Sequence, residues 1–162
     1  MSASLGGRLL VAVPGVLEDP NFRRTVVLLL EHSAQGALGL VLNRPTDQRV
    51  DDPFPGWDEP SSAPAVLFTG GPVQQGMIVA LGRAQLGVED TDGFQPVPAS
   101  VAERLGTVDL RRQPFDLAPA LDGLRVFSGY AGWSPGQLEA EIDQGAWWVL
   151  DAAPGDPFVG DP

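Results

Sequence analysis

His32 is the only histidine in the chain, and the chain contains no cysteine. A histidine of this kind could act as a general base if the fold brought a serine nucleophile and a carboxylate to it. His32 ends an apolar segment beside Glu31 and Ser33, so an ordinary surface or hydrogen-bonded histidine is the favoured interpretation. The lack of cysteine excludes disulfides, thiolate nucleophiles and cysteine-based zinc or iron–sulfur sites. We therefore expect no cofactor and no metal.

Two short motifs have the composition of ligand-binding loops. Asp90-Thr91-Asp92-Gly93 resembles part of a calcium loop, but Val88 and Ala99 occupy the positions of the first ligand and of the closing glutamate. A polar hairpin turn is therefore favoured for this motif. Gly70-Gly71 is not followed by Lys-Ser or Lys-Thr, so it does not form a phosphate-binding loop.

A more specific candidate surface comes from three segments, 43–45, 70–72 and 129–133, each predicted to terminate an apolar strand. Their glycines permit close backbone approach and their prolines stop the strands from extending the sheet, so we expect the segments to lie side by side. The two aromatic rings would then cover the gap as a ligand or partner surface, or they would plug the core of a tight turn. The candidate surface consists of Asn43, Arg44, Gly70, Gly71, Pro72, Tyr130 and Trp133.

The formal net charge is −11, and all ten cationic side chains are arginine. An acidic surface keeps a protein soluble and repels a phosphate backbone, so direct binding of duplex DNA is not expected. The two adjacent arginine pairs, Arg23–Arg24 and Arg111–Arg112, are interpreted as solvated surface because nucleic-acid binding needs a longer basic stripe.

The hydrophobic pattern predicts several short strands separated by turns rich in glycine and proline. Residues 24–43 are expected to form an antiparallel hairpin that turns at Ser33–Gly36. Residues 65–69 and 76–81 are expected to pair with each other. Further strands are predicted at 8–13, 106–110, 125–128 and 146–150.

The clearest predicted helix begins at Ser134, with Pro135 and Gln137 completing a capping-box pattern, and ends at Gly145. Its acidic side chains, Glu139, Glu141 and Asp143, are expected to point outward. In the strand that follows, Trp147 and Trp148 should lie on opposite faces.

Residues 46–64 are acidic and rich in proline, which makes a long helix or a central strand unfavourable there. The alternatives are a mobile flap and a loop with one short helical turn near Val50, and the second is favoured. Residues 114–121 are expected to start another short helix.

The length of 162 residues suits one domain over residues 1–150, followed by a Pro/Gly/Asp-rich tail at 151–162. Residues 1–7 lack the cationic start and apolar run of a signal peptide. The longest apolar run, 26–30, is far shorter than the ~20 residues of a membrane span. We therefore expect a soluble protein of the cytoplasm that does not enter a membrane.

Three long stretches of the chain resemble the YqgE/AlgH family of bacterial proteins. They are LLVAVPGVLEDPNFRRTVVLLLEH at 9–32 with GALGLVLNRP at 36–45, GGPV at 70–73, and RVFSGYAGWSPGQLEAEIDQGAWWV at 125–149. The resemblance implies an α+β fold, with a bifurcated mixed or antiparallel sheet rolled into a pseudo-barrel and a few flanking helices. It also implies a cytosolic protein of unsettled activity that is often described as a transcriptional regulator.

One departure from the family pattern concerns the end of the chain. Members of the family usually continue past the Trp-Trp strand into a C-terminal helix with Leu-Trp and several basic residues. No such helix is legible before Pro162, which is consistent with truncation before it.

These observations favour a non-enzymatic binding or regulatory module whose partner is a protein or a small molecule. One alternative is an enzyme that acts on a small phosphorylated or anionic substrate through carboxylates and Arg44. Another is direct DNA-binding regulation, although no helix-turn-helix is legible. The sequence does not indicate an oligomeric state.

Overall fold

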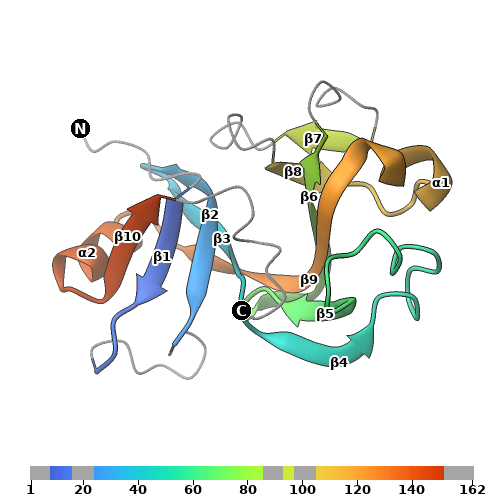
Figure 1. The fold of residues 1–162 in the computed structure, drawn as a ribbon. Helices are drawn as coiled ribbons and strands as arrows, with labels where there is room; N and C mark the ends of the chain where they lie inside the picture. The colour runs from blue at the N-terminus through green and yellow to red at the C-terminus, as the bar shows by residue number, and fades with distance from the viewer. Residues whose placement is uncertain (1–7, 16–23, 86–92, 97–104, 152–162) are drawn as a thin grey trace.

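The computed structural model describes residues 8–15, 24–85, 93–96 and 105–151. Within these ranges the chain forms ten strands, two short α-helices and one 3-10 turn (Figure 1). In chain order the elements are β1 (Arg8–Ala12), β2 (Val26–Ser33), β3 (Gly36–Val41), β4 (Pro45–Arg49), β5 (Val66–Thr69), β6 (Val73–Ala84), β7 (Phe94–Pro96), β8 (Leu105–Val108), α1 (Pro114–Leu117), η2 (Ala118–Ala120), β9 (Leu121–Trp133), α2 (Gln137–Asp143) and β10 (Trp147–Asp151).

The strands form one open sheet in the order β10-β1-β2-β3-β9-β6-β8-β7, and β5 joins β4 to the side of β9. Among the described strands every pair is antiparallel except β5 with β9. The strands at the two ends of the order, β10 and β7, do not pair with each other within the described ranges, so the predicted pseudo-barrel is not confirmed. The architecture is a mostly antiparallel, open sheet with short helices beside it, and it fits the predicted α+β class in this looser sense.

The sheet branches at β9. This strand pairs with β6 from Leu121 to Tyr130, while its residues 126–128 also pair with β5. Its last three residues, 131–133, pair with β3. Two halves therefore share β9, as Figure 1 shows. We call them the α2 half (β1, β2, β3, β10 and α2) and the α1 half (β4 to β8 and α1).

Both faces of the α2 half are apolar because β2 carries large apolar residues at consecutive positions. Val27 and Leu29 point to one face, where they belong to the same cluster as Leu138 of α2. Leu28 and Leu30 point to the other face and pack with side chains from β5, β6, β8 and β9. This alternation follows from the two-residue period of a strand, and a strand covered on both faces reads as a continuous apolar run.

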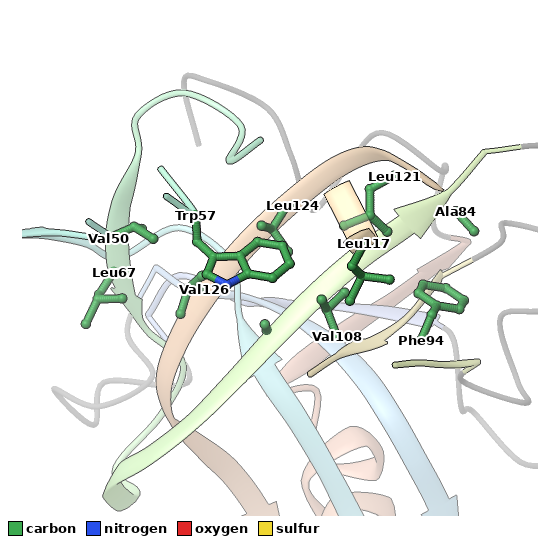
Figure 2. Close-up of a cluster of buried hydrophobic side chains, with 11 residues drawn as sticks. Val50, Trp57, Leu67, Ala84, Phe94, Val108, Leu117, Leu121, Leu124 and Val126 are labelled. Carbon is green, nitrogen blue, oxygen red and sulfur yellow. The ribbon is translucent and has the colours of Figure 1, made fainter. Parts of the chain in front are cut away.

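The α1 half has a core of its own, with Trp57 as its largest fully buried side chain (Figure 2). The indole N–H of Trp57 donates to the backbone carbonyl of Leu110 at 3.0 Å. Trp57 belongs to the acidic, proline-rich stretch 46–64. Burial of the ring and this hydrogen bond attach the stretch to the sheet, so the mobile-flap alternative is wrong.

The start of the same stretch is more regular than its composition indicates. Residues 45–49 form β4, which pairs with β5 at the side of the sheet, where a proline costs little. The backbone N–H of Phe54 then donates to the carbonyl of Val50 at 2.9 Å, which is the spacing of the predicted helical turn. The sequence reading therefore placed the turn and missed the strand.

Local pairings follow the sequence pattern, but one distant pairing does not. The hairpin predicted at 24–43 is confirmed as β2 and β3, joined by the expected turn. The predicted pairing of 65–69 with 76–81 is wrong, because β5 and β6 each pair with β9 and lie on opposite edges of it.

The predicted helix is present, but it starts later than expected. Pro135 and Gly136, whose φ is 78°, form a turn in which the N–H of Gln137 donates to the carbonyl of Ser134 at 3.0 Å. Helix α2 begins only at Gln137, whose Oε1 accepts from the Ser134 backbone N–H, so half of the capping box is made. The predicted stop at Gly145 is confirmed by its φ of 80°.

Candidate functional site

The three segments of the sequence-predicted surface do lie side by side. The N–H of Thr69 donates to the carbonyl of Arg44 at 2.9 Å. Gly70 contacts both β9 and β3. Its N–H donates to the carbonyl of Ser128 at 2.9 Å, and its own carbonyl accepts from the N–H of Val41 at 2.8 Å. In the next strand, β6 begins opposite Tyr130. The segments therefore meet where the sheet branches and the chain passes between its two halves.

The expectation that all three segments terminate strands is wrong for residues 129–133. These residues continue β9, because β3 offers a new partner strand beyond the branch and Trp133 pairs with Ala37. Gly129 sits at the change of partner with a φ of 77°, a conformation that glycine adopts without steric cost.

The glycines of this joint allow backbones to approach where a side chain would not fit. A Cβ on Gly70 would lie 2.4 Å from the carbonyl oxygen of Gly129, and one on Gly71 would lie 2.1 Å from the carbonyl carbon of Tyr130. Both distances are far below van der Waals contact. The requirement for glycine at these positions is therefore architectural.

The side chain of Asn43 is also engaged within the fold. Its Oδ1 accepts from the N–H of Val26 at 3.1 Å, and its Nδ2 donates to the carbonyl of Arg24 at 2.9 Å. Asn43 thereby holds the start of β2 against the end of β3. Arg44 and Pro72 are half-buried at the same joint.

The two aromatic residues of the predicted surface lie on different faces of the sheet, because they are three positions apart in one strand. Tyr130 is half-buried against the cluster between the two halves. Trp133 is only 6% exposed and belongs to the cluster under α2, so its ring does not cover the gap with Tyr130. The role of the seven residues as a ligand or partner surface stays a prediction.

Glu141 of α2 accepts hydrogen bonds from three side chains and was wrongly expected to face outward. The indole N–H groups of Trp133 and Trp147 donate to its Oε1 at 3.0 and 2.9 Å, and the amide of Gln137 donates to its Oε2 at 3.0 Å. The two indole rings meet edge to face, 6.1 Å apart. Buried indoles need acceptors, which is the signal that could have identified this carboxylate.

His32 contacts the same helix through a hydrogen bond, in agreement with its interpretation as a hydrogen-bonded histidine. Its Nε2 lies 3.1 Å from Oε2 of Glu139, and its side chain is 3% exposed. Hydrogen bonds from the Glu139 backbone and then from His32 lower the pKa of the Glu139 carboxyl. His32 therefore contributes to the attachment of α2 to β2.

A Gly-x-Ser-x-Gly pattern, missed in the sequence analysis, spans Gly132 to Gly136 between β9 and α2. In hydrolases such a turn exposes a nucleophilic serine to a histidine. Here the Ser134 hydroxyl has Gln137 Oε1 as its partner, at 3.2 Å, while His32 Nε2 contacts Glu139. These bonds direct the two side chains to α2 and not into a nucleophile–base pair.

Arg125 is a buried cation on β9 that the sequence reading left as an ordinary strand residue. Its Nη2 donates to the carbonyl of Ala63 at 2.7 Å, and its guanidinium lies 4.3 Å from the centroid of the Phe68 ring. Burial lowers the pKa of Arg125 to about 10, so it stays protonated at neutral pH. Its contacts fix the 62–64 segment to the sheet.

The large exposed apolar side chains of the described residues form two pairs, one in each half. Trp148 and Leu150 lie on β10 and are 54% and 49% exposed, whereas Met77 and Ile78 lie on β6. The predicted opposition of Trp147 and Trp148 is confirmed, since Trp147 is buried against α2. The strand that exposes Trp148 and Leu150 on one face is thus packed against α2 on its other face.

Comparison with known proteins assigns the chain to a family. The AlgH-like family model, DUF179, matches residues 9–162. The chain belongs to the AlgH-like family. A UPF0301 protein of Streptomyces avermitilis is 51% identical over 155 residues, which cover 95% of this chain and 79% of that relative. A UPF0301 protein of Mycolicibacterium smegmatis is 40% identical, with 94% of this chain and 75% of that relative covered.

Two solved structures resemble this chain, and each match covers 100% of it. Protein DIP2367 from Corynebacterium diphtheriae has a TM-score of 0.86 and 34% identity, and 82% of its chain is covered. The AlgH protein from Pseudomonas aeruginosa has a TM-score of 0.69 and 31% identity, with 86% of its chain covered. The names of these relatives state no reaction and no ligand.

Two features of the described residues bear on the function classes considered above. No group of three or more His, Asp or Glu side chains in these ranges is arranged to hold a metal ion. Among the helices of the same ranges, neither the length nor the apolar character needed to cross a membrane is reached. The calcium-like motif 90–93 lies outside the described residues except for Gly93, and so does the predicted tail beyond Asp151.

Proposed function

We propose that this AlgH-like protein is a non-catalytic binding module that takes an extended, basic and apolar segment of a protein partner along β10. The observation that carries the proposal is the exposure of Trp148 and Leu150 on one face of this strand. Exposed apolar residues grouped on a surface mark interaction sites more often than scattered ones do.

The position of β10 in the sheet supports this mode of binding. Among the described strands β10 pairs only with β1, so none of them pairs with its other edge. An extended peptide can add to such an edge, with backbone hydrogen bonds for affinity and alternate side chains for specificity. Trp148 and Leu150 alternate along the strand and would contact those side chains.

The charge of the chain indicates the chemistry of the partner. With 21 acidic residues against 10 arginines, the protein attracts basic segments and repels acidic ones. A partner strand with alternating apolar and basic residues would match both the exposed pair and the net charge.

The seven residues proposed from the sequence are not part of this site, because none of them lies on β10. The enzyme alternative has no observation among the described residues in its favour. The regulatory role and the cytoplasmic location implied by the family resemblance stay predictions.

The test uses an eight-residue peptide that alternates lysine and valine. We expect it to shift the NMR resonances of the β10 backbone amides and of the Trp148 indole more than those of the three other indoles. Replacement of Trp148 and Leu150 together by serine should weaken binding about tenfold or more. The matched control is a variant with serine in place of Met77 and Ile78, because that pair is also exposed but lies in the other half.

Three outcomes would contradict the proposal. One is equal binding of a peptide in which glutamate replaces lysine, since charge complementarity would then play no part. Another is equal binding by the Trp148/Leu150 variant. The third is the lack of any shift along β10, which would exclude strand addition at this edge.

A further inference from the structure

The α1 half contains a small hollow with an apolar wall. Phe54, Ile78, Val108 and Leu110 line it, and its volume is about 220 Å³. Ile78 is among the exposed large apolar side chains, so this wall is accessible from solvent. Sites for drug-sized ligands occupy about 300–1,000 Å³, so this hollow suits a smaller molecule.

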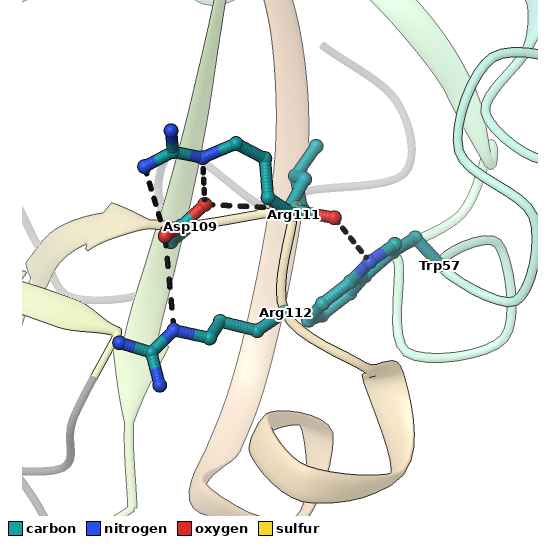
Figure 3. Close-up of polar contacts among 5 residues, drawn as sticks. Trp57, Asp109, Arg111 and Arg112 are labelled. Atoms are coloured by element: carbon teal, nitrogen blue, oxygen red, sulfur yellow. Dashed lines mark hydrogen bonds and ion pairs between the residues drawn. The ribbon is translucent and has the colours of Figure 1, made fainter.

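Asp109 and Arg111 line the hollow, and Arg112 lies beside the same aspartate, as Figure 3 shows for the three side chains. Asp109 binds the guanidinium of Arg111 through both carboxylate oxygens, at 2.9 and 3.2 Å. Nε of Arg112 lies 3.8 Å from the same carboxylate. The Asp109 carboxylate thus faces two guanidinium groups, and it is closest to that of Arg111.

The arrangement orients Arg111 while leaving it accessible. The hydrogen bond from the Arg111 side chain, followed by one from its backbone, lowers the pKa of the Asp109 carboxyl, which therefore stays ionised at neutral pH. Asp109 engages Nε and Nη2 of Arg111, and the side chain is 92% exposed. The donors on Nη1 can therefore reach an anion at the mouth of the hollow.

A second, open hollow of about 530 Å³ adjoins the first and shares Val108, Asp109 and Arg111 with it. Arg111 therefore borders both hollows and stands next to the apolar wall of the smaller one.

We propose that this place binds a small molecule with a short apolar body and one carboxylate. The body packs on Phe54, Ile78 and Leu110, and the carboxylate accepts hydrogen bonds from Arg111. A planar guanidinium matches a carboxylate in geometry and in charge. This site lies in the other half from β10 and does not depend on the function proposed there.

Trp57 provides a reporter for the test. Its buried indole N–H donates to the carbonyl of Leu110, which lines the hollow. We expect titration with hexanoate to shift the Trp57 indole resonance to saturation, while the indole resonances of Trp133, Trp147 and Trp148 stay unchanged. Acetate has no apolar body and hexanamide has no charge. Each should bind at least about tenfold more weakly than hexanoate.

The variants test the arginine directly. Arg111→Gln with Arg112→Gln should weaken hexanoate binding about tenfold or more. Arg49→Gln is the matched control, because Arg49 forms an exposed ion pair of the same sequence spacing with Asp51, at 2.9 Å, and neither residue lines the two hollows. Urea unfolding of each variant checks that the fold is retained.

Equal binding of hexanoate and hexanamide would overturn the proposal and leave only apolar partition. A hexanoate shift that does not saturate, or that Arg49→Gln reduces as much as the Arg111/Arg112 variant does, would overturn it too. The comparison of the three ligands uses the unaltered protein, so it decides the matter even where a variant fails to fold.

Discussion

The two halves of the sheet attach their covering segments by the same device with different acceptors. In the α2 half, the indoles of Trp133 and Trp147 donate to the Glu141 carboxylate of the helix. In the α1 half, the indole of Trp57 donates to the backbone carbonyl of Leu110. Apolar burial brings each segment to the sheet without fixing its orientation, and the indole N–H then fixes it.

Because the acceptors differ, the two halves should differ in their sensitivity to replacement of the acceptor residue. A carboxylate can receive several donors, so one side chain of α2 holds two strands at once. That contact is lost if Glu141 is replaced. A backbone carbonyl accepts fewer bonds but is present whatever residue stands at position 110. In the α2 half, replacement of a single acidic residue should therefore remove the indole contacts. In the α1 half, only replacement of the tryptophan should remove its contact.

The largest effect is expected at the joint that the halves share. Gly71→Ala places a Cβ within 2.1–2.4 Å of three backbone atoms of Tyr130 and Ala131, so strands must move apart. We expect a loss of about 3 kcal/mol or more in the free energy of unfolding, measured by urea denaturation. Gly76→Ala is the control, since its Cβ would meet nothing within 4 Å. Equal stability of the two variants would contradict the architectural role of the joint.

The next effect concerns the α2 half. Glu141→Ala leaves two largely buried indole N–H groups without their acceptor, at about 1–3 kcal/mol for each unsatisfied group. We expect a total loss of about 2 kcal/mol or more in the free energy of unfolding, together with a change in the near-ultraviolet circular dichroism of the tryptophans. Asp143→Ala, two residues along the same helix and exposed, should be close to neutral.

Trp57 tests the α1 half. Trp57→Phe removes the indole N–H and part of the buried ring, and we expect a loss of about 1–2 kcal/mol in urea denaturation. Replacement of Leu110 should leave the Trp57 indole N–H hydrogen-bonded, because the acceptor is a backbone carbonyl, and the NMR resonance of this N–H should show it. Trp148→Phe should stay within about 0.5 kcal/mol of the unaltered protein. A larger cost at position 148 than at 57 would reverse the assignment of buried and exposed rings.

The smallest effect is the pH dependence of the contact between Glu139 and His32. The pKa of Glu139 is lower in the fold than in the unfolded chain, so its contribution to stability is present above the unfolded value and is lost as pH falls through the folded one. We expect the difference in urea midpoint between the unaltered protein and Glu139→Gln to shrink from about pH 6 to about pH 3. A difference that is constant over this range would show that the carboxylate charge contributes nothing.

Features set by neighbouring residues could be predicted from the sequence. The hairpin of β2 and β3 follows from two apolar runs around a short polar turn, and the end of α2 follows from Gly145. The opposition of Trp147 and Trp148 follows from the period of a strand. In each case the deciding interactions lie within a few residues of one another, so the local pattern contains them.

Features set by distant partners could not be predicted in this way. Residues 129–133 read as a turn until β3 is known to lie beside them, and β5 and β6 read as a pair until both are found against β9. Proximity of the three segments of the joint was predictable from their glycines and prolines. Their contacts were not, because these depend on which strand lies next to which.

The same limit applies to the polar side chains. The sequence by itself determined that buried tryptophans, one histidine and many acids had to be accommodated, and it determined the local elements that carry them. Only the tertiary structure decided that Glu141 receives two indoles, that Arg125 is buried over Phe68, and that Ser134 contacts Gln137. The reason is geometric: a hydrogen bond needs its two atoms within about 3 Å, and strand register across the sheet sets those distances.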